Sequence, residues 1–172
     1  MKGDEAGKRR RDPRALSRSV IDETNESREP SAATVAAWAQ FVRIGQSILA
    51  MVEADLKRQG FPPLAHYDAL LELRRAGPKG LRPNELQHEM LLAQYSISRL
   101  VERLVHAGYV GRGAAEGDGR GQILRITPAG RTCLKSMWPV YADAIQRHFG
   151  ARLDIKDAER FAAILTKLQQ SC

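Results

Sequence analysis

Residues 93–107 read AQYSISRLVERLVHA and carry the clearest pattern in the 172-residue chain. The apolar residues recur at i, i+3, i+4, i+7 and i+8, a spacing that places them on one face of a helix. They are Ile97, Leu100, Val101, Leu104 and Val105. Gly108 follows directly and is typical of a helix end. We therefore predict a helix with one face in the core and a polar face free for a partner.

The sequence after this helix predicts a β-hairpin. Residues 109–112 and 122–126 have the composition of two short strands. Glycines at 113, 117, 119 and 121 lie between them and predict a long, mobile loop.

The sequence before it predicts two more helices. Residues 64–76 form a helical pattern between a break at 61–63 and Gly77-Pro78. Pro83 suits the first position of a short helix because a proline there has no amide that needs a partner. Three helices followed by a hairpin define a winged helix-turn-helix, assigned here to residues 61–127.

Long amphipathic helices flank this unit. The pattern predicts helices over 34–58, 128–149 and 154–170, with Thr127 and Asp154 as N-terminal caps. Their apolar faces are wider than a unit of this size can cover, so a second copy of the chain is the economical partner. The expected fold is mainly α with a small β-hairpin: a charged, disordered tail (1–30), an N-terminal dimerisation helix (31–60), the winged unit and C-terminal dimerisation helices (128–172).

Composition narrows the class of protein. The net charge of +7 favours a polyanionic partner. No run of eighteen or more apolar residues occurs, which excludes a membrane span, and the two cysteines, Cys133 and Cys172, fit a reducing, cytoplasmic setting. We find no catalytic motif, metal-ligand spacing or cofactor signature.

The polar face of the 93–107 helix supplies the candidate contacts to double-stranded DNA. A helix in the major groove reads base edges through polar side chains. The candidate readers are Gln94, Ser96, Ser98 and Arg99, and the candidate phosphate or minor-groove contacts are Arg103, Arg112 and Arg120. In a two-fold homodimer the paired helices would lie about 34 Å apart and would read a near-palindromic operator.

Three stretches resemble the MarR family of transcriptional regulators. They are YDALLELRRAGPKGLRPNELQHEM (67–90), YSISRLVERLVHAGYVGR (95–112) and DGRGQILRITPAGR (118–131). The resemblance implies that Arg120 enters the minor groove and that Asp118 orients it. Two positions depart from the family pattern: Ala93 stands where a capping serine is usual, and Gly119 where a second basic residue is common.

The resemblance also implies a dimeric repressor, less often an activator, released from DNA by a small aromatic or anionic effector. The candidate pocket residues are Trp38, Phe41, His66 and Tyr67. Ordinary core packing is the alternative for this set.

Two other functions stay open. Cys133 could make the protein a redox-sensing regulator, although a packing role suits it better. A nonspecific architectural protein would also bind nucleic acid. Residues 61–131 hold ten Lys and Arg against seven Asp and Glu, a net charge of +3, which is modest for binding by charge alone.

Overall fold

The computed structural model describes residues 29–91, 96–115 and 118–169, with the side chains of 115 and 118–121 left undescribed. The predicted tail, except for Glu29 and Pro30, and the predicted reader Gln94 lie outside these ranges. The chain forms two compact units, residues 1–44 and 45–172, and the boundary falls inside the first helix.

That helix, α1, spans Ala32–Arg58 and begins two residues earlier than predicted. Ser31 caps it, because its Oγ accepts a hydrogen bond from the Thr34 amide at 3.1 Å. In the first unit the helix exposes a run of large apolar side chains: Val35, Trp38, Phe41 and Ile44. The rings of Trp38 and Phe41 lie 6.4 Å apart.

The composition of α1 corrects the argument against a membrane span. An 18-residue window of this helix has a mean hydropathy of 1.3, so by length and composition alone α1 could cross a membrane. The prediction counted only uninterrupted apolar runs, and a few polar residues do not prevent a helix from being apolar on average. Only 6% of that window is buried, so many of the large apolar side chains of α1 are exposed.

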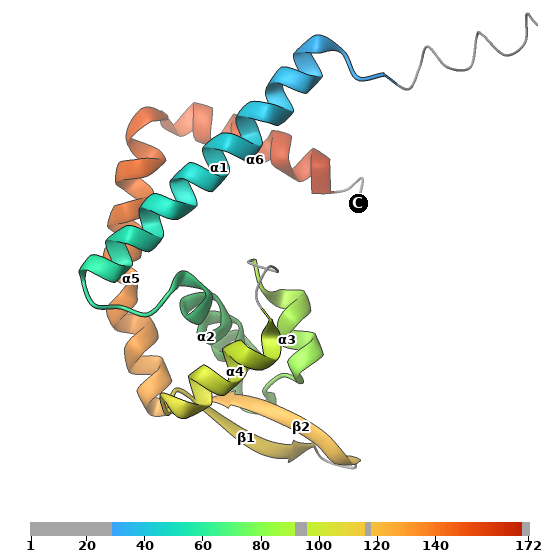
Figure 1. Ribbon diagram of the computed structural model, residues 1–172, viewed down its shortest axis with the longest axis vertical. Coiled ribbons are helices and arrows are strands. Elements are labelled where there is room, and N and C mark those ends of the chain that lie inside the picture. Colours follow the sequence, from blue (N-terminus) through green and yellow to red (C-terminus); the bar gives the residue numbers. More distant parts are fainter. Residues whose placement is uncertain (1–28, 92–95, 116–117, 170–172) are drawn as a thin grey trace, which may run out of the picture. The chain divides into compact units, whose positions relative to one another are not determined.

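The second unit contains the rest of α1 and the remaining elements in the predicted order (Figure 1). They are α2 (Leu64–Ala76), η1 (Gly77–Lys79), α3 (Pro83–Glu89), α4 (Ile97–His106), β1 (Val110–Ala115), β2 (Asp118–Ile126), α5 (Pro128–His148), η2 (Gly150–Arg152) and α6 (Ile155–Gln169). The predicted fold class, mainly helical with one hairpin in a winged helix-turn-helix, is confirmed.

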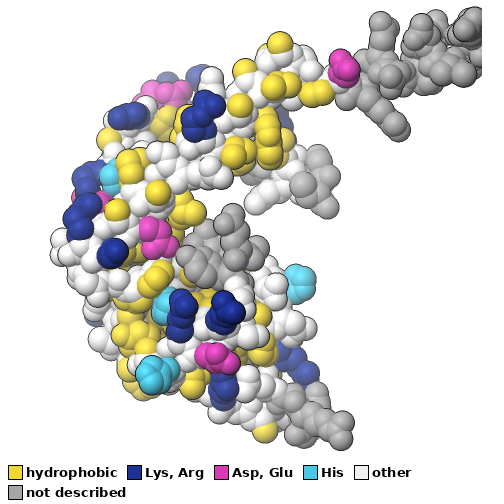
Figure 2. Space-filling view, in the orientation of Figure 1, with side chains coloured by type: hydrophobic (Ala, Val, Ile, Leu, Met, Phe, Trp, Pro, Cys, Tyr) yellow, Lys and Arg dark blue, Asp and Glu magenta, His cyan; other side chains and the backbone are white. Residues whose placement is uncertain are grey.

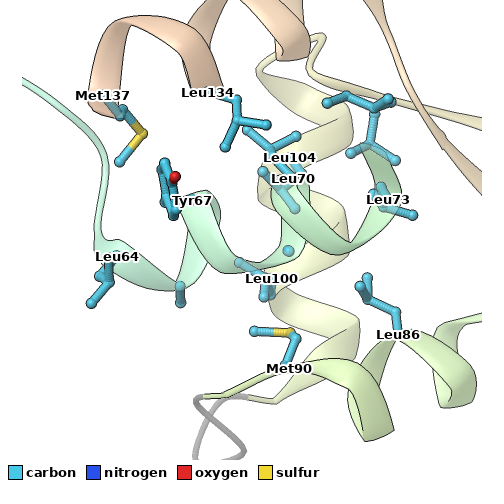
Figure 3. Close-up of a cluster of buried hydrophobic side chains, with 14 of the residues drawn as sticks. Leu64, Tyr67, Leu70, Leu73, Leu86, Met90, Leu100, Leu104, Leu134 and Met137 are labelled. Carbon is cyan, nitrogen blue, oxygen red and sulfur yellow. The ribbon is translucent and has the colours of Figure 1, made fainter. Parts of the chain in front are cut away.

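The core of this unit is built around α2, of which nearly every residue from Leu64 to Leu73 is buried. Figure 3 shows its side chains meeting those of α3, α4 and α5. The largest fully buried side chains come from helices and hairpin alike: Leu56, Leu70, Leu73, Leu86, Leu104, Leu124, Leu134 and Met137. One continuous core therefore holds α4 and the hairpin in place.

The start of α2 depends on a cap from another helix. Pro63 at the N-cap position makes no side-chain hydrogen bond. Both carboxylate oxygens of Glu53, on α1, instead accept from the Leu64 amide at 3.1 Å. An acidic group at a helix N-terminus is also favoured by the helix dipole. Glu53 thus joins the second-unit part of α1 to α2.

The described part of α4 is shorter than the predicted 93–107 helix. It begins at Ile97 with Ser96 as N-cap residue, so the cap does not fall on Ala93, which lies outside the described residues. Apolar periodicity marks a face and not a boundary, which is why the start was misplaced. The end is as predicted: the amides of Gly108 and Tyr109 donate to Val105 and Leu104 carbonyls, both at 2.9 Å.

The hairpin strands are longer than predicted, so the prediction of a long loop between them is wrong. The two strands pair in antiparallel fashion from Val110 with Ile126 to Ala115 with Asp118, with an irregularity after Ala114. Gly113 lies inside a strand, opposite Ile123. Cross-strand pairing overrides the low strand preference of glycine.

Leu81 adds a third, one-residue strand that the sequence did not reveal. It exchanges two backbone hydrogen bonds with Leu124, at 3.1 and 2.8 Å. Gly80 precedes it with φ of 69° and fits closely against β2. This bridge attaches the hairpin to the segment that leads into α3.

Both predicted caps of the C-terminal helices are confirmed. Thr127 Oγ1 accepts from the Gly130 amide at 3.0 Å and donates to the Gly108 carbonyl at 2.7 Å. Asp154 Oδ1 accepts from the Asp157 amide at 2.7 Å. None of the residues of α6 is buried, and Ile155, Ile164 and Leu168 are exposed.

Candidate nucleic-acid interface

The exposed face of α4 is polar and basic. Leu100, Val101 and Leu104 are buried, while Ile97 and Val105 are half-buried, so the predicted apolar face is in the core. The opposite face exposes Ser96, Ser98, Arg99, Glu102, Arg103 and His106. Figure 2 shows basic side chains over this part of the molecule.

A shallow depression of about 420 Å³ follows this face, lined by Arg99, Glu102, Arg103 and His106. An exposed helix whose side chains are short hydroxyls and long guanidiniums can enter a major groove. Serines hydrogen-bond base edges, and arginine binds guanine or phosphate through two parallel hydrogen bonds.

The structure brings together four of the eight predicted DNA-binding residues, Ser96, Ser98, Arg99 and Arg103, on this one surface. Arg112 is exposed on β1, in register with Leu124. Gln94 and the side chains of Asp118 and Arg120 lie outside the described residues, although the backbone places the last two in β2. The minor-groove role of Arg120 therefore stays a prediction.

Arg125, which sequence reasoning missed, anchors the hairpin. Its Nε donates to the Pro78 carbonyl at 2.8 Å, which connects β2 to η1. A Cβ on Gly113 would lie 2.8 Å from Arg125 Nη1, so the side chain extends across the hairpin to the glycine. Its alternation with the buried Leu124 could have shown that it projects from the opposite face, but not that it binds Pro78.

His66 lies buried on α2 and is electrostatically coupled to Arg103 on α4. His66 is buried, and its Nδ1 has no hydrogen-bond partner within the part of the chain that the structure describes. Burial, and secondarily the positive charge of Arg103, lowers the pKa of His66. The imidazole is therefore kept neutral beside a basic surface.

The predicted pocket residues divide between the two units. Trp38 and Phe41, in the first unit, are 66% and 48% exposed, whereas His66 and Tyr67 are buried in the second. Tyr67 packs against Tyr141 and Trp138, with ring centroids 5.0 and 6.3 Å away. Burial raises the pKa of Tyr67 and of Tyr141, so both phenols stay protonated.

The cavities of the second unit lie beside other residues. One of about 460 Å³ is lined by Glu53, Ala54, Lys57, Phe61 and Pro63. Another of about 220 Å³ lies between the end of α1 and α5. An effector pocket formed by the four predicted residues therefore stays a prediction.

Cys133 is half-buried on α5 next to Tyr109 and Met137. Burial raises the pKa of its thiol, and a hydrogen bond with Tyr109 opposes that shift in part. Its Sγ lies 3.9 Å from Met137 Sδ. Low thiolate content makes a cysteine a poor nucleophile. Among the described residues, no group of three or more His, Cys, Asp or Glu side chains could hold a metal ion.

Helices α2, α3 and α4, the hairpin that follows them and the basic exposed face of α4 define the class. This is a winged helix-turn-helix protein of the kind that binds duplex DNA. Residues 59–121 match the sequence model of the MarR family, and this match confirms the resemblance predicted from the sequence. The region that carries α4 and most of the hairpin is thus a MarR-family region, in a family of transcriptional regulators.

Solved structures share the fold over most of the chain. Sco3205, a MarR family transcriptional regulator from Streptomyces coelicolor in complex with DNA, is 24% identical with a TM-score of 0.71, covering 83% of this chain and 93% of that one. AbsC, another MarR family transcriptional regulator from the same organism, is 22% identical with a TM-score of 0.70, covering 84% and 97%.

BpsR from Bordetella bronchiseptica, whose DNA binding is regulated by 6-hydroxynicotinic acid, is 19% identical with a TM-score of 0.70. The alignment covers 82% of this chain and 98% of that one. No curated protein sequence matches this chain significantly.

Proposed function

We propose that this protein is a sequence-specific, double-stranded-DNA-binding regulator of transcription that acts as a homodimeric repressor in the cytoplasm. The observation that carries the proposal is the exposed face of α4, where Ser96, Ser98, Arg99 and Arg103 lie together above a buried apolar face. The similarity of the fold to Sco3205, whose structure contains DNA, supports it.

A division of labour follows from the chemistry of these side chains. Ser98 and Arg99 would read base edges, with Ser96 and Gln94 near the helix start. Arg103 and Arg112 would neutralise phosphates. Arg120, oriented by Asp118, would enter the minor groove from the hairpin, where a narrow groove attracts guanidinium groups.

Exposed apolar helix faces support the homodimer. In the first unit α1 exposes Trp38 and Phe41, and in the second α6 exposes Ile155, Ile164 and Leu168. Figure 2 shows hydrophobic side chains at the surface of α1. Large apolar side chains exposed along a helix are typical of interfaces. On this proposal residues 31–60 and 128–172 form the dimer, residues 61–127 bind a near-palindromic operator and residues 1–30 form a tail.

Release by a small aromatic or anionic effector is the finer part of the proposal. The regulation of BpsR DNA binding by 6-hydroxynicotinic acid offers a precedent in a protein with the same fold. Trp38, Phe41, His66 and Tyr67 are the proposed pocket residues. Isothermal titration with a panel of aromatic acids is the direct test, and the absence of heat across the panel would remove this part.

Binding to selected DNA tests the main proposal. Fragments enriched from genomic DNA by the purified protein should contain inverted half-sites about one helical turn apart, bound about 10³-fold more tightly than scrambled duplex. Nearly equal affinities would favour the architectural alternative. Loss of binding on peroxide treatment, reversed by a thiol, would favour the redox alternative at Cys133.

Matched arginine variants test the surface itself. Arg103→Ala should weaken binding and lower the salt dependence by about one counterion, because a phosphate contact is lost. Arg99→Ala should weaken binding and relax the preference at one base position. Arg152→Ala removes an exposed arginine from η2, far along the chain from α4, and should leave affinity unchanged.

A further inference from the structure

A buried carboxylate joins the end of α1 to the end of α5. Asp55 is 3% exposed. Its Oδ2 accepts from Arg147 Nη2 at 2.7 Å and lies 2.8 Å from His148 Nε2. Its Oδ1 is paired with Arg58, one turn further along α1. Both oxygens are therefore satisfied.

The contacts of Asp55 differ in kind. The pair with Arg58 is local, and so is the pair between Arg147 and Asp143, with Nε and Oδ2 2.8 Å apart. Local pairs of this sort stabilise a single helix. The contacts of Asp55 with Arg147 and His148 instead join residues 92 and 93 positions apart. They fix one helix relative to another.

Apolar packing at the same junction is less directional. Val52 and Leu56 on α1 and Ala144 on α5 belong to the shared core. Hydrophobic contact is non-directional, so such side chains tolerate small rotations of one helix over the other. Hydrogen bonds weaken steeply with angle, so a carboxylate held by two groups of α5 defines one arrangement.

A small movement at the contact between Asp55 and the end of α5 would be amplified at the winged unit. The chain enters that unit from α1 and leaves it through α5. The 21 residues of α5 span about 32 Å, so a rotation of about 10° at His148 would move the other end by about 5 Å. That displacement exceeds the rise of one base pair, about 3.4 Å.

Pro139 lies between the two ends of α5 and makes the anchored end more important. A proline inside a helix removes one backbone hydrogen bond and is a usual site of bending. Pro139 and Asp55 line the same cavity of about 220 Å³. A bend at Pro139 would change the position of the DNA-binding end of α5, whereas the contacts of Asp55 hold the other end against α1.

We propose that Asp55 is a positioning residue: by fixing the end of α5 against α1, it sets the spacing and angle of the two α4 helices in the dimer. The inference rests on the proposed function, because it requires a dimer that reads two half-sites. It predicts a specific defect on loss of the carboxylate: poorer discrimination of half-site spacing, in addition to any loss of stability.

Two spin labels in one chain measure the geometry without DNA. Cysteines at Gln46 on α1 and Lys135 on α5, both exposed, are introduced after Cys133 and Cys172 are changed to serine. Mixing with excess unlabelled protein restricts the measured distances to one chain. Asp55→Asn should broaden or shift a distance distribution that is narrow in the otherwise unmodified protein.

Glu72→Gln is the matched control. Glu72 is also a buried carboxylate with an exposed arginine partner, Arg75, but their pair is local to α2, at 2.5 Å. This variant should lose stability without changing the distance distribution. If Asp55→Asn does not fold, Arg147→Gln leaves Asp55 paired with Arg58 and His148 and should produce a smaller broadening.

The DNA arm uses duplexes whose half-sites are moved by one or two base pairs. The parent protein should lose about tenfold in affinity when the spacing leaves its optimum, and Asp55→Asn about threefold or less, at temperatures where both are folded. Failure of the parent protein to bind any paired site would refute the proposed function. Distance distributions and spacing preferences identical in Asp55→Asn and the parent would overturn the role of Asp55.

Discussion

Replacing Gly80 by alanine should detach the hairpin from the segment that leads into α3. Gly80 has φ of 69° and ψ of −172°, a conformation almost restricted to glycine. A Cβ there would overlap the Leu124 carbonyl oxygen and lie 2.7 Å from Ile123 Cγ2. Backbone cannot yield as a flexible side chain can, so the Leu81–Leu124 bridge must open.

Gly77→Ala is the control that isolates this overlap. Gly77 has φ of 63° and ψ of −144°, in nearly the same region, but an added Cβ meets no atom within 4 Å. Both variants therefore bear a conformational cost of about 1–3 kcal/mol. Only Gly80→Ala also breaks two backbone hydrogen bonds, each contributing about 1 kcal/mol.

The free energy of unfolding in urea should fall by about 2 kcal/mol more in Gly80→Ala than in Gly77→Ala. Because domains of this size are stable by only about 5–15 kcal/mol, the larger loss should be easy to resolve by circular dichroism. Under conditions where both variants are folded, Gly80→Ala should also bind DNA more weakly. A difference in stability below about 0.5 kcal/mol would refute the reasoning.

Four further outcomes follow from the contacts of the second unit. Glu53→Ala should lower the free energy of unfolding by about 1 kcal/mol, because the Leu64 amide loses its cap, while Glu159→Ala on exposed α6 should not; equal melting temperatures would contradict the cap. The pKa of His66 is lowered, so the unfolded chain binds its proton first and stability should decline as the pH falls below about 6.5; His66→Gln should flatten that decline, and an unchanged slope would argue against it. The pKa of Asp55 is lowered, chiefly by the hydrogen bond with His148, so its contribution is present above pH 3.8 and is lost as the pH falls further; acid unfolding of Asp55→Asn should lack that component. Cys133, whose pKa burial raises, should react with iodoacetamide much more slowly in the folded protein than in urea, and equal rates would show that the thiol is accessible.

These outcomes separate two roles of charge in the protein. On α4 the exposed arginines are available to a polyanion, and their loss should change binding more than stability. At Asp55 the charges are satisfied internally, and their loss should change stability and geometry together. His66 lies between the two cases, since it is buried but responds to the charge of Arg103.

Local patterns were enough to predict the elements and which faces of α4 are buried and exposed. The apolar spacing of residues 97–105 indicated both faces of α4, and Pro83, Thr127 and Asp154 indicated where helices start. These features can be read directly because helix periodicity and capping depend on residues three or four positions apart. The resemblance of the winged region to the MarR family rested on the same local stretches.

Contacts between distant residues could not be read in this way. The pairing of Leu81 with Leu124, the cap from Glu53 to Leu64 and the approach of Asp55 to His148 depend on how elements pack, which no local spacing encodes. Strand length was misjudged for the same reason, since partners across a hairpin override the preference of each glycine. Burial of His66 beside Arg103 likewise arises only when α2 and α4 share one core.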